Sequence, residues 1–412
     1  MSADPVHEGE GILDGIRVLD LTGALAGPYA AMMLAEHGAD VIEVEHPVTG
    51  DEARVWPPIV GDVSSYFGSI NRSKRSLAVD LKDPEGLAIV RELAGRADIM
   101  MQSFTPGVID RLGLGYDDVR AINPTVVYYS LSGYGQDGPW RHKRGYDPII
   151  QAASGFMSVT GETGRTPVKS MIPIADLSSA IYGYAAILGA LFRRQRTGKG
   201  QYIDMAMMDV NVSMLSVVGS RYLHTGIVPQ RSGTQNPQRV PSAAFECEDG
   251  RFLQVVPNQR QWPAFCVLLG HEEWAEDPRF ATPPARTCHQ DLLYPMIREA
   301  FLARDAEEWS HRLEEATIAA SPIYSIDEVF ALPQVQHRRM VQSYADPEAG
   351  DVAAISLPFR YSETPARIKT GPPRLGQHSV EILRELGRSK EDIDELLTRG
   401  AVTESRTEKD RT

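Results

Sequence analysis

Cysteine is scarce in this sequence, with only Cys247, Cys266 and Cys288 among 412 residues. Their wide spacing and odd number argue against a disulfide framework and predict a reducing, cytoplasmic location. The sequence also lacks CxxC, HExxH and Walker patterns, and the adjacent Cys288 and His289 have no second pair of ligands. We therefore expect neither a bound metal nor a permanently bound cofactor.

Positive charge and long apolar runs are also in short supply. Acidic residues number 55 against 42 lysines and arginines, and the net charge of −13 argues against nucleic acid or an anionic membrane as a partner. The acidic start, MSADPVHEGEGILDG, is unlike a signal peptide. The most apolar run, residues 177–192, is shorter than the roughly 20 residues that span a bilayer. It contains serines and glycines, and we interpret it as a buried helix.

Apolar residues make up 42% of the chain, and their pattern alternates between strands and helices. The segment IRVLDL (16–21) is typical of a buried strand, and YAAMMLAEHG (29–38) of a helix that ends at a glycine. DVIEVE (40–45) follows as a second strand and completes a βαβ unit. The alternation continues through later segments. The sequence therefore predicts an α/β protein with an open, doubly wound, Rossmann-like large domain.

A change of composition marks the end of this large domain. Beyond residue 226 the chain becomes rich in glycine, proline, serine and asparagine, and a hairpin pattern surrounds EDG at 248–250. We predict that residues 12–220 form the first part of the large domain and residues 221–330 a small α+β domain with its linkers. Residues 331–402 are expected to return to the large domain, and the charged residues 403–412 to form a tail.

The turn after the first predicted strand raises the question of a dinucleotide cofactor. It reads TGALAGPYA rather than G-x-G-x-x-G, and Pro28 removes a backbone donor that a pyrophosphate would use. Glu45 stands where a ribose-binding acid is expected, but acids are common at strand ends. A nicotinamide cofactor is therefore not expected.

Asp176 stands alone at the head of the apolar run and allows two interpretations. An aspartate before an apolar helix is ordinarily an N-cap, whose hydrogen bond contributes about 1 kcal/mol. A helix N-terminus also favours an ionised carboxylate where water is scarce, and such a group is a competent nucleophile toward an activated acyl group. The small neighbours Ala175, Ser178 and Ser179 leave room for a ligand. The residues alone permit both roles.

Several longer blocks of the chain resemble one family. In chain order they are RVLDLTGALAGPYAAMMLAEHGADVIEVEHPVTGDEAR, NRSKRSLAVDLKDPEG, PGVIDRLGLGYDDV, YYSLSGYGQDGPW, RGYDPIIQAASGFMSVTG and RRQRTGKGQYIDMAMMD. Together they are similar to the class III CoA-transferases, the family of carnitine and formyl-CoA transferases. The resemblance implies a large CoA-binding domain, a small domain, and an interlocked homodimer with the site between the two chains. It also implies that an acyl-CoA and a free carboxylic acid are the substrates.

The same resemblance places the nucleophile on Asp176, in IADLSSA. It implies a mixed anhydride between Asp176 and the donor acyl group, followed by an aspartyl-CoA thioester. The related α-methylacyl-CoA racemases use this acid beside a histidine for proton exchange. Their GHD motif reads GYD here, at residues 145–147, and tyrosine is a poor base near neutral pH. Transfer is therefore preferred over racemisation, and an acyl-CoA-binding protein without turnover is a third alternative.

The resemblance also assigns residues to CoA. The segments NRSKRS and IDRLG are expected to bind its adenosine and phosphates, although by themselves they also fit solvated basic loops. In KRGYDP, Arg144 stands where formyl-CoA transferases carry a lysine that contacts CoA. The turn GALAGP is expected beside the thioester, where backbone N–H groups would stabilise an oxyanion. The residues concerned are Arg72, Lys74, Arg75 and Arg111 for the adenosine and phosphates, Ala24, Leu25 and Ala26 for the thioester, and His46, Ser103, Arg144 and Tyr146 for further CoA contacts.

The acyl group is less well specified by the sequence. Leu25 replaces a glutamine of formyl-CoA transferases, which disfavours a small polar oxalate site. We expect a larger donor, such as succinyl-CoA or another dicarboxylyl-CoA. A distal carboxylate would need a cation, and Arg54 and Arg239 are candidates. The residues expected to line the acyl site are Leu25, Trp56, Tyr146 and Asp147.

Overall fold

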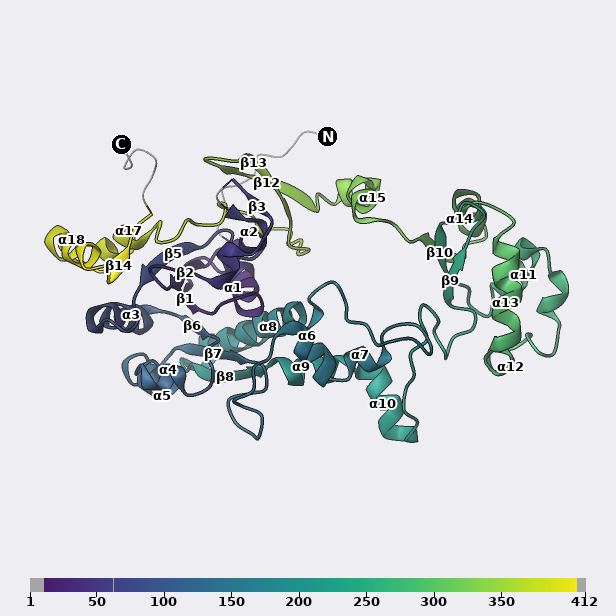
Figure 1. Ribbon diagram of the computed structural model, residues 1–412, viewed down its shortest axis with the longest axis horizontal. Coiled ribbons are helices and arrows are strands. Elements are labelled where there is room, and N and C mark those ends of the chain that lie inside the picture. The colour runs from purple at the N-terminus through teal and green to yellow at the C-terminus, as the bar shows by residue number, and fades with distance from the viewer. Residues whose placement is uncertain (1–10, 62, 406–412) are drawn as a thin grey trace. The chain divides into compact units, whose positions relative to one another are not determined.

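The computed structural model describes residues 11–61 and 63–405 (Figure 1). The chain separates into two compact units. The first contains the described residues up to 155, residues 170–220 and the described residues from 336 onward. The second contains residues 156–169 and 221–335. Residues 1–10 of the acidic start and most of the expected tail lie outside the described residues.

A seven-stranded sheet forms the centre of the first unit. Its strands are β1 (Arg17–Leu21), β2 (Asp40–Glu45), β5 (Arg75–Val79), β6 (Ile99–Gln102), β7 (Val127–Ser132), β8 (Gln201–Ala206) and β14 (Val402–Thr403). They lie in the order β14-β5-β2-β1-β6-β7-β8, and all neighbours are parallel except β14, which pairs antiparallel with β5. The prediction of an α/β fold with a mostly parallel central sheet is confirmed.

Helices cover both faces of this sheet. They are α1 (Ala26–Glu36), α2 (Ser65–Ile70), α3 (Pro84–Arg96), α4 (Val108–Arg111), α5 (Tyr116–Ile122), α6 (Asp147–Ala153), α8 (Ile174–Thr197), α9 (Met207–Met214), α17 (Ser379–Glu385) and α18 (Lys390–Thr398). Because alternate strand residues point to opposite faces, Val18 packs in a core with α1 and α8, and Leu19 packs in a second core with α3 and α18. Strands buried on both faces need nearly continuous apolar runs, which the sequence provides.

Helix α8 is longer than the apolar run that predicted it. It has 24 residues, because Arg193, Arg194 and Arg196 continue it to a left-handed C-cap at Gly198. By length and composition it is the one helix in the described part of the chain that passes as a membrane span, although core helices pass the same test. Its contacts with α1, α6 and α9 place one side of it in the core of the first unit.

The second unit has its own core around a three-stranded antiparallel sheet of order β11-β10-β9. Its elements are α7 (Phe156–Val159), β9 (Ala243–Glu246), β10 (Phe252–Val256), α11 (Trp262–Leu269), η2 (Glu272–Ala275), α12 (Pro283–Cys288), α13 (Gln290–Phe301), α14 (Ala306–Glu315), β11 (Ala319–Pro322) and α15 (Ile326–Ala331). Trp262, Phe301 and Trp309 are buried in this core. Strands β9 and β10 form the hairpin predicted around residues 248–250.

Short elements complete the chain. The first unit also contains η1 (Glu52–Val55), the pair β3 (Ile59–Val60) and β4 (Val63–Ser64), and the hairpin of β12 (Val341–Asp346) and β13 (Gly350–Ile355). Helices α10 (Ser216–Thr225) and α16 (Pro333–His337) contain boundaries between the units. Because η1 follows β2 after only a short loop, it lies at the same edge of the sheet as the carboxyl end of β2.

Candidate active site

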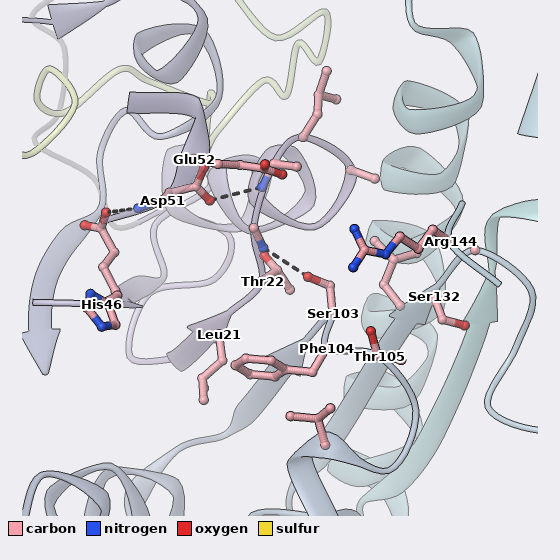
Figure 2. Close-up of a pocket in the computed structure, with 18 of the residues that line it drawn as sticks. Leu21, Thr22, His46, Asp51, Glu52, Ser103, Phe104, Thr105, Ser132 and Arg144 are labelled. Carbon is pink, nitrogen blue, oxygen red and sulfur yellow. Dashed lines mark hydrogen bonds between the residues drawn. The ribbon is translucent and has the colours of Figure 1, made fainter. Parts of the chain in front are cut away.

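A cavity of about 700 Å³ lies at the carboxyl ends of the parallel strands, and all of its lining residues belong to the first unit (Figure 2). Its wall consists of segments that follow β1, β2, β5, β6, β7 and β8. Strand order reverses between β1 and β6, and open α/β sheets bind ligands at such a switch point. Fold topology therefore identifies this cavity as the candidate active site.

The turn between β1 and α1 forms one part of the wall and has an unusual backbone. Ala24 has a positive φ of 68°, a conformation that costs a non-glycine residue about 1 kcal/mol. The Gly23 N–H donates to Ser103 Oγ at 3.0 Å and the Ala24 N–H to Asp51 Oδ2 at 3.0 Å, both drawn as dashed lines in Figure 2. Helix α1 then begins at Ala26, so the N–H groups of its first turn have no partner within the helix.

Asp176 lies on the same cavity, in the first turn of α8. The N-cap interpretation of this residue is wrong, because the N-cap position is Pro173. The side chain is only partly exposed. Burial, and secondly the nearby Asp147 carboxyl, raise the pKa of Asp176 to about 7. The group is thus a carboxyl that is partly ionised at neutral pH and poorly hydrated when ionised.

Asp147 does not line the cavity but binds the backbone at the start of the helix that carries Asp176. It is the first residue of α6 and is buried. Its Oδ1 accepts the backbone N–H of Ala175 at 2.8 Å, and its Oδ2 accepts a hydrogen bond from Gln151 at 2.7 Å. Pro173 has no side chain able to cap α8, so Asp147 takes over that task. The expectation that Asp147 lines the acyl site is therefore wrong, and its effect on Asp176 is indirect.

Aromatic and aliphatic side chains line the part of the cavity near Leu25. Trp56 and Tyr66 contact each other edge to face, with ring centroids 4.8 Å apart. Leu25 is buried and packs in a small cluster with both rings and with Leu177, the residue after Asp176. Burial, with a smaller contribution from Asp176, raises the pKa of Tyr66 to about 12, so its hydroxyl remains protonated. Tyr146 also lines the cavity and is half exposed.

The basic segment NRSKRS does not reach the cavity, which corrects the expectation placed on it. Lys74 is fully buried, and its Nζ binds Asp20 at 2.8 Å and Asn71 at 2.7 Å. Arg72 is buried against Glu36 at 3.0 Å. The physical reason is that both side chains are buried, and a buried cation needs a carboxylate partner.

Two more arginines that were expected to bind CoA phosphates also lie outside the cavity lining. Arg75 pairs with Asp40, Glu381 and Glu385. Arg111 lines a second cavity, of about 490 Å³, rather than the first. We therefore do not retain Arg72, Lys74, Arg75 and Arg111 as phosphate ligands.

Other cations line the cavity instead. Lys82 follows the carboxyl end of β5, and Arg141 and Lys143 precede Arg144 in the loop after β7. Of these four, sequence analysis identified only Arg144, which is exposed and points toward the cavity in Figure 2. The run RHKR before the GYD motif was the signal for two of the missed residues. The position of Lys82 shortly after the apolar segment SLAV (76–79) was the signal for the third.

The remaining predicted residues have clear positions. Ala24, His46 and Ser103 line the cavity, and His46 is exposed at the end of β2. Arg54 binds both oxygens of Glu45 at 2.6 Å and also donates to the Pro373 carbonyl, so its charge is already paired. Arg239 belongs to the second unit. Neither arginine is a candidate partner for an acyl carboxylate within this cavity.

The comparisons with known proteins agree with this fold. The family model for CoA-transferase family III matches residues 13–379. Human succinyl-CoA:glutarate CoA-transferase is 36% identical over 96% of this chain and 91% of its own. Succinate–glutarate CoA-transferase of Agrobacterium fabrum is 39% identical over 91% and 95%.

Among solved structures, a CAIB/BAIF family protein from Brucella suis is 35% identical and superposes with a TM-score of 0.82, over 92% of this chain and 100% of that protein. Family match, curated relatives and solved structure cover nearly the whole described chain, so the resemblance stated from the sequence blocks is confirmed. The protein belongs to the class III CoA-transferases and is an enzyme of that family.

Proposed function

We propose that this enzyme moves CoA from an acyl-CoA to a free carboxylic acid through covalent intermediates on Asp176. The observation that carries the proposal is the position of Asp176, a half-buried carboxyl with a pKa raised to about 7 on the wall of the strand-end cavity. A partly desolvated carboxylate is more nucleophilic than a hydrated one. A cavity of about 700 Å³ is large enough for a pantetheine arm and a small acyl group.

The proposed cycle has four displacements. An oxygen of ionised Asp176 attacks the thioester carbonyl, CoA leaves as a thiolate, and a mixed anhydride remains. The thiolate attacks the Asp176 carbonyl, which forms an aspartyl-CoA thioester and releases the donor acid. The acceptor carboxylate then attacks this thioester and expels the thiolate, and the thiolate attacks the acceptor carbonyl of the new anhydride. Asp176 is regenerated, and the acyl-bond energy is conserved because anhydride and thioester have comparable reactivity.

Each displacement passes through a tetrahedral oxyanion that needs hydrogen-bond donors. The N–H groups at the start of α1 are free of intrahelical bonds, and residues 23–26 line the same cavity as Asp176. Donors at a helix N-terminus also benefit from the helix dipole. We assign the oxyanion site to this turn.

The cations on the cavity are proposed to bind the CoA phosphates and the distal end of the acyl group. Lys82, Arg141, Lys143 and Arg144 line the cavity of a chain whose net charge is −13, so they concentrate positive charge where an anionic substrate needs it. The names of two relatives include succinyl-CoA or succinate together with glutarate. We propose succinyl-CoA or another dicarboxylyl-CoA as donor and a dicarboxylic acid as acceptor.

We also propose the interlocked homodimer and a cytoplasmic location. Support for the dimer comes from apolar side chains exposed in the single chain, among them Met171 at 90% and Leu223 at 81%. Ile181 and Tyr182 of α8 and Val217 of α10 are exposed as well. A surface with this many large apolar groups is typical of a chain that associates.

Trapping experiments test the covalent step. The enzyme is incubated with succinyl-CoA, quenched with hydroxylamine or borohydride, and mapped by peptide mass spectrometry. Modification of Asp176 is the expected result, and Asp204, another carboxyl with a raised pKa but outside the cavity lining, serves as an internal control that should stay unmodified. Asp176→Ala should abolish transfer and leave CoA binding within about tenfold, or about 1.4 kcal/mol.

The same assay separates the alternatives. Exchange of the α-proton of an acyl-CoA in deuterated water, without any adduct, would identify a racemase that uses Asp176 as a base. Binding of acyl-CoA without adduct or exchange would identify a protein that has lost turnover. Full activity of Asp176→Ala would contradict all roles proposed for this residue.

A further inference from the structure

Asp51 occupies a special place on the cavity wall. It lies in the loop between β2 and η1, is buried, and lines the cavity. Its two oxygens accept different backbone donors: Oδ1 accepts the Ala53 N–H at 2.6 Å, and Oδ2 accepts the Ala24 N–H at 3.0 Å. The first bond caps η1 locally, whereas the second crosses to the turn after β1. One carboxylate thus joins two loops that meet above the sheet (Figure 2).

The position of Asp51 is itself held by a network of buried charges. Its backbone N–H donates to Glu45 Oε2 at 3.0 Å, and Glu45 is bound by Arg54 through both oxygens. Ser76 Oγ donates to Glu45 Oε1 at 2.7 Å. These bonds leave the Asp51 side chain little freedom to move, so its carboxylate is a rigid acceptor.

The turn to which Asp51 is hydrogen-bonded has a strained backbone. Ala24 is a non-glycine residue with a φ of 68°, and a strained residue of this kind persists only where its surroundings hold it. Two bonds do so, one from the Gly23 N–H to Ser103 and one from the Ala24 N–H to Asp51. A side-chain carbon on Gly23 would come within 3.2 Å of Asp51 Oδ2, which shows how closely the carboxylate approaches the turn.

We propose that Asp51 is a positioning residue for acyl transfer, which sets the direction of the N–H groups that begin α1 by holding Ala24 in its left-handed conformation. The proposal rests on the function proposed above, since those N–H groups are the assigned oxyanion donors. Asp51 uses both oxygens on backbone donors, so in this role it does not react with substrate. It affects the rate of acyl transfer indirectly, because the turn of residues 23–25 orients the proposed oxyanion donors.

The Asp51 carboxyl accepts two N–H groups most strongly when it is ionised, and its surroundings allow that form at neutral pH. Burial raises the pKa of Asp51 to about 6, while the bonds from Ala53 and Ala24 oppose that rise. Charged and titratable groups facing it are Glu45 from β2, Lys74 from the loop before β5, Arg54 from η1 and Tyr66 from α2. At neutral pH the carboxylate form therefore predominates, and it accepts both N–H groups.

The test compares Asp51 with a matched carboxylate. Asp346 is also buried and accepts two backbone N–H groups, from Glu348 and Ala349 at 3.0 Å each, both through Oδ1. It differs from Asp51 in that it also binds Arg374 at 3.2 Å and lies in the β12–β13 hairpin, not on the cavity. Asp51→Asn and Asp51→Ala are measured beside Asp346→Asn and Asp346→Ala. Steady-state transfer with succinyl-CoA and a panel of dicarboxylic acids is combined with single-turnover trapping of the Asp176 adduct and with thermal unfolding.

We expect all four variants to lose some thermal stability, because the Asp51 variants lose an acceptor for the Ala24 or Ala53 N–H and the Asp346 variants lose the ion pair with Arg374. Only the Asp51 pair should lose rate: kcat and the adduct-formation rate fall about 10- to 100-fold, with Ala worse than Asn and KM changed by less than about threefold. Asn keeps one acceptor oxygen, which explains the order.

Two results would overturn the role of Asp51 alone, provided that wild type forms the adduct. One is an equal kcat in the Asp51 and Asp346 variants. The other is a raised KM with unchanged kcat in the Asp51 variants. If wild type forms no adduct and transfers no CoA, the proposed function fails and this role fails with it. The presence or absence of the wild-type adduct therefore distinguishes the two failures.

Discussion

Asp147 caps the helix that carries Asp176: its Oδ1 accepts the Ala175 N–H at 2.8 Å, across 28 positions of sequence. The bond ties the start of α6 to the start of α8 and fixes Asp147 next to the proposed nucleophile. The same proximity places a second negative charge beside Asp176 and contributes to its raised pKa. Asp147 thus both caps the helix of Asp176 and adds to a pKa shift that burial mainly causes.

The rate of Asp176 acylation is expected to depend on pH. The ionised form is the nucleophile, and burial followed by Asp147 raises its pKa to about 7. Below that pH the rate should fall about tenfold per unit, and above it the rate should level off. Single-turnover trapping of the adduct between about pH 5.5 and pH 8.5 measures this profile. A rate that stays constant across this range would show that the carboxyl ionises closer to its ordinary pKa of 3.8 and is not desolvated in the working enzyme.

The substitution Asp147→Asn should shift this profile. The asparagine side chain would still accept the Ala175 N–H but would carry no charge, so the pKa of Asp176 should fall and the inflection move to lower pH. Gln151 loses its carboxylate acceptor, and some thermal stability should be lost too. The position of the inflection is the diagnostic measurement. An unchanged inflection would mean that burial alone raises the pKa.

We expect the substitution Glu43→Gln, outside the cavity, to stabilise the protein. It is buried in β2, neither of its oxygens has a hydrogen-bond partner among the described residues, and burial followed by Glu45 raises its pKa well above the ordinary value. The folded state therefore holds a proton that the unfolded chain releases, and stability falls as pH rises above the ordinary glutamate pKa. Glu43→Gln removes this penalty and should raise Tm at pH 7 by about 2 °C.

The pH dependence of that gain provides the control. Below the ordinary glutamate pKa both states are protonated, and the difference between Glu43→Gln and wild type should largely vanish. Thermal unfolding at about pH 4 and pH 7 makes the comparison. A gain that is equal at both pH values would show that packing rather than ionisation is responsible.

The exposed apolar side of α8 predicts the effect of charge at the proposed dimer interface. Ile181 is 52% exposed, and Ile181→Asp should convert a dimer into monomers, because a carboxylate in an apolar interface lacks a partner. Sedimentation velocity measures the mass in solution. Val48→Asp adds the same charge at an exposed apolar residue in a loop and should leave the dimer intact. A wild-type monomer would contradict the proposed assembly.

Sequence patterns predicted the sheet well because its signals are local. Strands such as 16–21 and 40–45 are short apolar runs bounded by turn residues, and burial on both faces demands that composition. Asp176 stood out at the head of an apolar run, but that position alone permitted two roles, and the family resemblance assigned the nucleophile to it.

The ion-pair partners of charged residues could not be predicted from the sequence. Lys74 and Arg75 belong to a basic segment that looks like a phosphate site, yet Lys74 binds Asp20, 54 positions away, and Arg75 binds Glu385, 310 positions away. Lys82 and Arg141 line the cavity although the family resemblance assigned no role to them. Only the folded chain decides which cations meet carboxylates, because ion pairs join residues that the topology brings together.

By itself, then, the sequence determined the α/β class, the family and the residue proposed as nucleophile, since periodicity and motif order are properties of the chain. The tertiary structure alone decided that Asp147 caps the helix of Asp176, that Asp51 holds the Ala24 turn, and which cations line the cavity. The physical reason is that hydrogen bonds and charge pairing act through space over a few ångströms and carry no trace in sequence spacing.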